Sequence, residues 1–187
     1  MPRSDASRNR EAVLASARAL FSAVGPDVQM PEIAKAAGVG VGTVYRHFPS
    51  RDALIDAAAD ARFAEIEEYA RAYHLGPGDG LIRYLFHVGA ILAEDRGLSR
   101  AIESRHGTTE PKGPAREALE KVVRAMLEIA QETGEIRLDT PLSDIDLVLA
   151  GLSAVIRWGG DWQRYLAIAV RGLRPPAPDA YEAEEEL

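Results

Sequence analysis

The chain has 187 residues, a formal net charge of −7, and 47% hydrophobic and 27% charged residues. This composition is ordinary for a soluble globular protein of one compact domain, or of a small domain joined to a larger one. The absence of cysteine excludes disulfides, thiolate metal sites and a cysteine nucleophile. No apolar run approaches about 18 residues and no apolar segment follows the N-terminus, so we expect no membrane span, no secretory signal and a cytoplasmic location.

Charge is unevenly distributed along the chain. Residues 1–51 contain seven Lys or Arg and four acidic residues, whereas the remainder contains fifteen and twenty-five. The first segment therefore carries a formal +3 and the rest −10. This asymmetry is typical of a basic head that contacts a polyanion and an acidic body that does not.

Apolar residues recur at helical spacing through most of the chain, and no segment shows the alternation of a strand. Turn-forming residues separate the periodic stretches, as in "GPD" at 25–27 and "HLGPGDG" at 74–80. The sequence therefore predicts an all-α fold. The predicted helices cover residues 9–24, 30–37, 41–48, 51–73, 80–95, 97–106, 114–132, 142–157 and 162–173.

Several residues mark the ends of these helices. Pro31 lies in a first turn and Gly38 lies just past an end, which are the positions that helices favour for them. Ser50 is expected to cap the long helix that follows it. Thr140 is expected to cap the helix over 142–157, with Pro141 in its first turn.

The last two helices differ in their apolar pattern. The helix over 142–157 is apolar on nearly every face, which indicates burial on both sides by a large core or by a core plus a partner subunit. The helix over 162–173 has one apolar stripe that we assign to a dimer contact. Residues 175–187 are proline-rich and then acidic, which predicts a disordered tail.

The stretch "AAGVGVGTVYRHFPS" at 36–50 contains glycines that could mark a phosphate-binding loop. The dinucleotide fingerprint does not fit, because the third glycine comes one residue early and a helix precedes the loop. A P-loop does not fit either, since its lysine is missing. A helix-turn-helix fits, with Gly38 supplying the left-handed turn between two short helices.

The second of these short helices has two distinct faces. At about 100° per residue, Val41, Val44 and Phe48 point one way and are expected to pack on the preceding helices. The opposite face and its flanks consist of small, polar or basic residues, namely Gly42, Thr43, Tyr45, Arg46 and His47. This face carries no acid, as a helix that enters a DNA groove requires.

Residues 10–54, "REAVLASARALFSAVGPDVQMPEIAKAAGVGVGTVYRHFPSRDAL", resemble the N-terminal domain of the tetracycline-repressor (TetR) family. The matching features are "ALF", "IAKAAGV" and "GTVYRHFPSRDAL". The resemblance implies a three-helix DNA-binding domain with a helix-turn-helix over 1–52. It also implies a C-terminal helical bundle over 53–174 for ligand binding and dimerisation.

The resemblance also implies which residues contact DNA. Thr43 and Arg46 match base-reading positions, and Tyr45, His47 and Arg51 match positions that hold phosphates. The implied set is completed by Gln29, near a helix start that touches the DNA backbone, and by Gly42, which allows close approach. One departure is that Gly40 and Val41 stand where many members have a polar pair, so Val41 either packs inward or touches a thymine methyl.

The C-terminal bundle offers candidates for a ligand site, because bundles bind ligands between helices among apolar and a few polar side chains. The candidate ligand residues are Tyr84, His87, Ile91, His106, Met126 and Trp158. The candidate dimer residues are Leu149, Leu152, Trp162, Leu166 and Val170. Each of the ligand candidates, taken singly, is more often a core residue or a dimer contact than a ligand contact.

The sequence supplies no catalytic set and no metal site. Glu103 and His106 have the i, i+3 spacing of di-iron bundles, but those bundles need two such motifs. We therefore expect no cofactor and no enzyme activity. The remaining alternatives to a ligand-responsive regulator are a DNA-binding dimer that answers to a protein or to nothing, and a helical enzyme with a repressor-like head.

These observations predict a sequence-specific transcriptional regulator that acts as a homodimer on a palindromic operator, most simply a repressor. Its expected partners are double-stranded DNA, an unknown small-molecule effector and a second copy of the chain. No membrane partner is expected.

Overall fold

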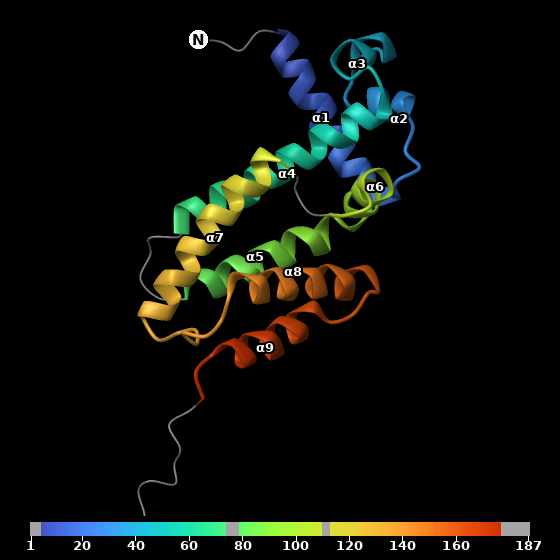
Figure 1. The fold of residues 1–187 in the computed structure, drawn as a ribbon. Helices are drawn as coiled ribbons and strands as arrows, with labels where there is room; N and C mark the ends of the chain where they lie inside the picture. Colours follow the sequence, from blue (N-terminus) through green and yellow to red (C-terminus); the bar gives the residue numbers. More distant parts are fainter. Residues whose placement is uncertain (1–4, 74–78, 110–112, 177–187) are drawn as a thin grey trace, which may run out of the picture.

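A computed structural model describes residues 5–73, 79–109 and 113–176. Within these ranges the ordered elements are all helices, which confirms the all-α prediction. Figure 1 shows α1 to α3 at one end, α8 and α9 at the other, and α4 running between the two lobes. The helices are α1 (Asp5–Val24), α2 (Met30–Ala36), α3 (Val41–His47), α4 (Arg51–Tyr73), α5 (Gly80–Glu94), α6 (Arg96–His106), α7 (Pro114–Glu132), α8 (Leu142–Arg157) and α9 (Trp162–Leu173).

The N-terminal lobe, which we call the head, forms around the apolar stripes of α1 to α4. Its core also includes apolar residues of α6, so the head is packed against an element that lies much later in the sequence. The fully buried members of this core include Val13, Ala17, Phe21, Ile33, Val44, Leu54, Ala58 and Leu98. Packing of α6 onto α1 and α4 therefore joins the head to the rest of the chain.

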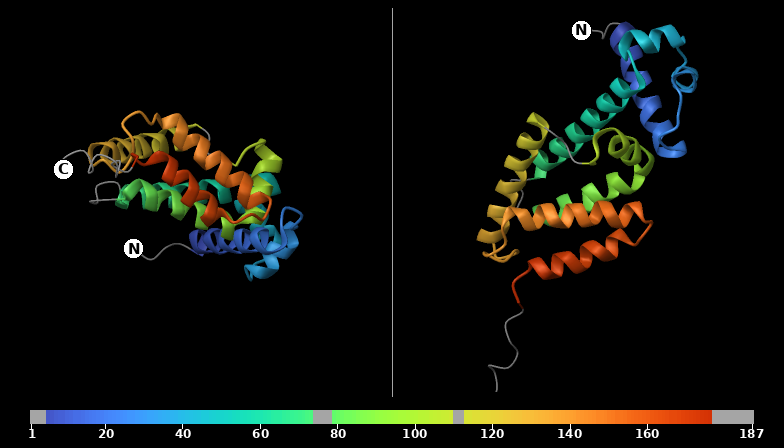
Figure 2. Two further views of the ribbon diagram at one scale, coloured as in Figure 1. Left: turned by 90° about the horizontal axis from the view of Figure 1, so that it is seen from below. Right: turned by 45° about the vertical axis from the view of Figure 1, so that its right-hand side comes forward.

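The larger lobe, which we call the body, is a bundle of the second half of α4 with α5, α7, α8 and α9 (Figure 2). Helix α5 is central, because it packs against α4, α7, α8 and α9. Its burial agrees with this central position, since seven of its fifteen residues are buried. None of the helices in the described ranges combines the length and apolar character that a membrane crossing requires.

The helix ends agree with the sequence in most places. The backbone N–H of Ala53 donates to Oγ of Ser50 at 3.1 Å, so Ser50 caps α4 as expected. Gly38 has φ of 67°, the left-handed conformation that the turn requires. The expected cap of α8 is wrong: Pro141, with ψ of 161°, occupies the N-cap position, and Thr140 lies buried before it without capping the helix.

Two predictions concern residues that lie largely outside the described ranges. The proposed turn at 74–80 falls mostly there. So does the proposed tail at 175–187, of which the structure describes only residues 175 and 176.

Candidate functional site

Helix α3 lies at the outer end of the head, and its inward side is anchored in the head core. Val44 is fully buried and Phe48 is 2% exposed, as their positions on the helix predict. Tyr45 on the outer side is 48% exposed, and Gly42 and Arg46 are exposed as well. Anchoring one face in this way presents the other face as a fixed surface.

The outward face of α3 is positively charged. The helix contains no acidic residue, and its last turn carries Arg46 and His47. In this structure the Arg46 guanidinium donates from Nε to the Gly42 carbonyl at 3.3 Å and from Nη2 to Oγ1 of Thr43 at 3.4 Å. Both are long hydrogen bonds at the surface, so Arg46 can exchange them for a ligand at little cost.

Two other predicted residues lie at the starts of neighbouring helices. Arg51 begins α4 and donates from Nε to the Val28 carbonyl at 3.2 Å, while its guanidinium lies 5.7 Å from the centre of the Phe21 ring. Gln29 precedes α2; its backbone N–H donates to Oε2 of Glu32 at 2.8 Å and its side chain donates to the Asp27 carbonyl. The Nε atom of Arg51 is thus engaged with the backbone, and Gln29 remains exposed.

The expectation that Val41 packs on the preceding helices is wrong. Val41 is 38% exposed, because it is the first residue of α3 and lies beyond the reach of the head core. Gly40 and Gly42 are also free of close neighbours: a Cβ added to either would meet no atom within 4 Å. The packing of the chain itself therefore does not require these two glycines.

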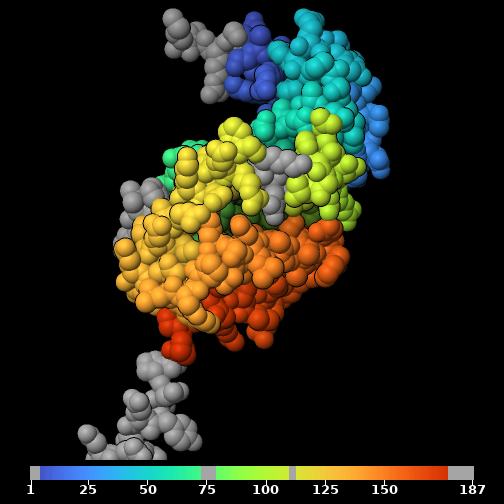
Figure 3. Space-filling model, viewed as in Figure 1, coloured from blue at the N-terminus to red at the C-terminus, as the bar shows by residue number. Residues whose placement is uncertain are grey.

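The body contains a cavity between α4, α5, α7 and α8. The cavity is open to solvent, and the empty space inside it and at its mouth together is about 500 Å³. In Figure 3 green atoms of α5 are visible at the bottom of a hollow between α7 and α8. The lining is apolar apart from Tyr84 and Thr109 and consists of Phe63, Ile66, Tyr84, Val88, Leu92, Thr109, Leu119, Leu149 and Ala150.

A second hollow continues from this cavity past Tyr84, Leu119 and Leu149 toward Arg116 and Asp146. Tyr84 is 1% exposed, and burial raises the pKa of its hydroxyl. The phenol is therefore neutral at any physiological pH. It can donate or accept a hydrogen bond inside an otherwise apolar space.

The predicted ligand residues are scattered. Of the six, Tyr84 lines the cavity. His87 instead stacks on Tyr69, with the ring centres 3.5 Å apart. Burial lowers the pKa of His87. Met126 is part of the body core, and Ile91 packs against it without lining the cavity. Trp158 is 82% exposed and is the C-cap residue that follows α8.

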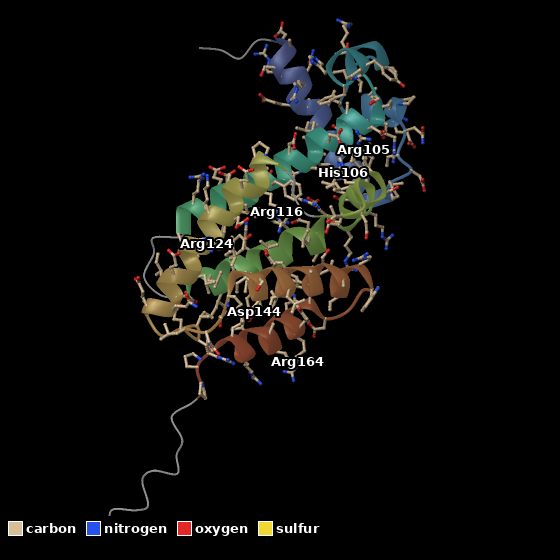
Figure 4. All side chains as sticks on the ribbon, in the orientation of Figure 1. Arg105, His106, Arg116, Arg124, Asp144 and Arg164 are labelled. Atoms are coloured by element: carbon tan, nitrogen blue, oxygen red, sulfur yellow. The ribbon has the colours of Figure 1, made fainter. Side chains whose placement is uncertain are left out.

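His106, the sixth, lies at a joint between α6 and α4 (Figure 4). Its Nε2 is 2.9 Å from Oδ1 of Asp56. Arg105 donates to both carboxylate oxygens of Asp56, at 2.7 and 2.9 Å, and to Asp52 at 2.9 Å. The hydrogen bond from Arg105 is the main cause of the lowered pKa of Asp56. This cluster ties the end of α6 to the start of α4, where Arg51 lies.

The five candidate dimer residues of α8 and α9 are buried or half-buried within the chain itself. Leu152 and Leu166 are fully buried and Val170 is 7% exposed within the chain's own core. Leu149 lines the cavity, and Trp162 packs against Phe86 and over Gly89. The exposed large apolar side chains in this region are instead Leu147 of α8, Trp158 directly after α8 and Ile168 of α9.

Some cavity residues were not predicted from the sequence, notably Phe63, Thr109 and Leu119. Arg62 was missed as well, although a signal existed. It lies four residues after Ala58 and four before Ile66, both buried, so a charged residue interrupts the apolar stripe of α4.

No group of three or more potential metal ligands occurs in the described part of the chain.

Comparison with known proteins identifies the class of this fold. A sequence model described as bacterial regulatory proteins of the tetR family matches residues 13–58. A second, described as the C-terminal domain of SbtR-like transcriptional regulators, matches residues 76–175, more than half of the chain. The chain belongs to the TetR family. It is accordingly a DNA-binding transcriptional regulator and not an enzyme.

Solved structures of other TetR-family regulators agree with this. A TetR transcription regulatory protein from Mycobacterium vanbaalenii is 35% identical, with a TM-score of 0.71, and the match covers 91% of this chain and 98% of that one. A TetR transcriptional regulator from Streptomyces coelicolor is 31% identical over 90% of this chain and 99% of that one, with a TM-score of 0.68. RolR in complex with resorcinol is 23% identical over 90% of this chain and 88% of that one, with a TM-score of 0.58, and shares the fold.

A curated relative is similar over a shorter stretch. An HTH-type transcriptional regulator from Staphylococcus aureus is 42% identical over 73 residues. This stretch covers 35% of the present chain and 38% of the relative's own length.

Proposed function

We propose that this TetR-family regulator is a ligand-responsive repressor that binds a palindromic operator as a homodimer in the cytoplasm. Residues 1–52 would form its DNA-binding domain and residues 53–174 its ligand-binding and dimerisation domain. The observation that carries the proposal is the exposed, acid-free and basic face of α3, which is held rigidly by Val44 and Phe48.

In this proposal α3 enters the major groove. Thr43 and Arg46 read base edges, because a guanidinium pairs with two acceptors of guanine. Tyr45, His47 and Arg51 hold phosphates on either side, and Gln29 contacts the DNA backbone at the start of α2. A dimer places two copies of α3 roughly 34–36 Å apart, which matches successive major grooves on one side of the duplex.

Gly42→Ala separates DNA binding from folding. The position is helical and a Cβ there meets nothing within 4 Å, so alanine is expected to stabilise the free protein by roughly 0.5–1 kcal/mol. The same methyl group faces the DNA and is expected to weaken operator binding. Urea unfolding and fluorescence anisotropy on one preparation test both effects. Unchanged affinity would remove Gly42 from the interface.

We propose that the second copy of the chain docks on the exposed side of α8 and α9. Leu147 lies on α8 and Trp158 is the C-cap residue directly after it, eleven residues or about three full turns later, so the two share one side of the helix. They are 71% and 82% exposed, and Ile168 on the adjacent α9 is 57% exposed. Apolar side chains exposed together on packed helices support an interface with another chain.

Leu147→Glu tests this face. A charge in place of an apolar side chain at an interface core is expected to weaken dimerisation by about tenfold or more. Leu138→Glu is the matched control, because Leu138 is 83% exposed on the connection between α7 and α8. Light scattering over a concentration series should show dissociation for Leu147→Glu alone. Equal behaviour of the two variants would place the interface elsewhere.

The body cavity supports a small-molecule effector. Its walls come from four helices, including α4, which also begins at Arg51 in the head. A ligand that prefers one arrangement of α4 and α6 changes the spacing of the two heads, and this differential affinity is the physical basis of the switch. RolR, which shares the fold, is known in complex with resorcinol.

Selection of the operator from random DNA, followed by a screen for compounds that release it, tests the proposal. We expect an enriched palindrome and a stoichiometry of two chains per site. An enriched site without two-fold symmetry would contradict the homodimer. Operator binding that no compound changes would contradict a small-molecule effector. It would favour a regulator that responds to a protein partner or has no effector.

A further inference from the structure

Arg62 of α4 is a fully buried cation. Its exposed fraction is 0%, which makes it exceptional among charged residues, since arginine is almost never fully buried unless it is paired. The side chain lies at the level where α4, α6 and the connection between α6 and α7 meet. The energetic cost of this burial requires a compensating interaction.

The hydrogen bonds of Arg62 satisfy only part of its guanidinium. Nη1 donates to Oγ of Ser99 at 2.9 Å and Nη2 donates to the Thr109 carbonyl at 3.3 Å. Nε is buried and has no hydrogen-bond partner among the residues that the structure describes. Both partners are neutral, and no carboxylate of the described residues lies within 4.0 Å of the guanidinium.

The acid that acts on Arg62 from a greater distance is Asp95, and it is engaged elsewhere. Its Oδ2 pairs with Nη2 of Arg18 at 3.4 Å, and its Oδ1 accepts from Oγ of Ser22 at 2.6 Å. Arg18 also repels Arg62. Desolvation lowers the pKa of Arg62 to about 10, so the side chain is still a cation at neutral pH.

Arg62 lies directly behind the wall of the body cavity. Thr109, whose carbonyl accepts from Arg62, lines the cavity, and so does Phe63, whose ring centre is 5.2 Å from the Arg62 guanidinium. Ser99 and Thr109 also line an adjoining hollow with Arg96, Arg100 and Arg157, where Glu103 is the one acidic residue among the described lining residues. The polar end of an apolar cavity is therefore positive.

We propose that the effector is an organic acid whose carboxylate pairs with Arg62 while its hydrocarbon or aromatic body fills the cavity. This inference rests on the proposed ligand-responsive function and names the chemical class of the ligand. A carboxylate accepts two parallel hydrogen bonds from a guanidinium fork, including one from Nε. It takes the place of the Thr109 carbonyl, the longer of the two bonds that Arg62 makes.

The experiment compares carboxylic acids with their own amides. A graded series that includes benzoate, phenylacetate and octanoate is titrated calorimetrically against the full chain, beside benzamide, phenylacetamide and octanamide. Each amide keeps the body of its acid and removes the charge. We expect at least one acid to bind about tenfold or more tightly than its amide and to release the selected operator.

Arg62→Met removes the cation and keeps a similar apolar length. This variant is expected to lose the preference for acid over amide. Its thermal midpoint without ligand should be equal to or above that of the unchanged protein, because a buried unpaired charge has been removed. Arg71→Met is the matched control, since Arg71 lies on the same helix, is exposed and pairs with Glu67 at 2.7 Å.

The outcomes separate this inference from the proposed function. Release of the operator by neutral compounds but by no acid overturns the organic-acid effector and leaves the ligand-responsive regulator intact. An acid preference that survives in Arg62→Met overturns the role of Arg62. If no compound of either kind binds at millimolar concentration, the effector and this inference both fail, while operator binding, measured separately, still stands. The acid–amide comparison in the unchanged protein decides the ligand class even if Arg62→Met does not fold.

Discussion

Arg46→Ala is expected to bind DNA with its base preference lost at the positions that Arg46 contacts. The expected loss of discrimination is about 1–3 kcal/mol, because a bidentate guanidinium contact distinguishes guanine from the other bases. Folding should be unaffected, since Arg46 is exposed and makes only hydrogen bonds of 3.3 and 3.4 Å within its own helix. Binding-site selection with the variant and the unchanged protein measures the effect.

Tyr45→Phe provides the contrast for that experiment. Its hydroxyl is proposed to hold a phosphate, so its loss should weaken binding to all sequences alike and leave the selected sequence unchanged. The two substitutions therefore have different kinds of effect: Arg46→Ala changes the preferred DNA sequence, and Tyr45→Phe lowers the affinity for every sequence. If Arg46→Ala selects the same sequence as the unchanged protein, Arg46 does not read bases.

Gly97→Ala is expected to destabilise the protein by about 3 kcal/mol. A Cβ at Gly97 would lie 1.7 Å from the Phe21 carbonyl oxygen and 2.8 Å from its carbon. These are backbone atoms at the end of α1, so no side chain can move aside and α6 must separate from α1. Urea unfolding followed by circular dichroism measures the loss.

Gly172→Ala is the control for this substitution. Gly172 is also helical, in α9, and a Cβ there meets nothing within 4 Å. It should be neutral or stabilising, by roughly 0.5–1 kcal/mol. Equal stability of the two variants would show that α6 does not approach α1 as closely as described.

Gly97 also indicates how the two lobes are joined. The start of α6 is pressed against α1, and there Arg18 pairs with Glu65 of α4 and Asp95 before α6. The end of α6 is held to the start of α4 by Arg105. Helix α6 thus contacts the head at both of its ends, while Ser99 between them is bonded to Arg62.

Local patterns predicted the head well. Helix positions, the turn at Gly38 and the cap at Ser50 follow from residues that are neighbours in sequence, and the structure has them. The burial of Val44 and Phe48 follows from helical periodicity over a single short helix. Val41 departs from the pattern because periodicity assigns a direction and does not state how far the core extends.

Local patterns were a poor guide to contacts in the body. Leu152, Leu166 and Val170 form apolar stripes in sequence, but a stripe does not say whether it meets the same chain or another. Here these residues pack into the chain's own core. Trp158 shows the converse case, an apolar residue left at the surface where a ligand contact was expected.

The sequence by itself determined the helices, the basic acid-free face of α3 and the family, because each depends on spacing within a short segment. The tertiary structure alone decided which apolar faces remain exposed, where the cavity lies and which residues line it. It also decided that Arg62 is buried without a carboxylate partner in the described part of the chain, and that Gly97 touches the backbone of α1. These contacts join residues dozens of positions apart, and helical periodicity carries no information about which helix becomes the neighbour of another.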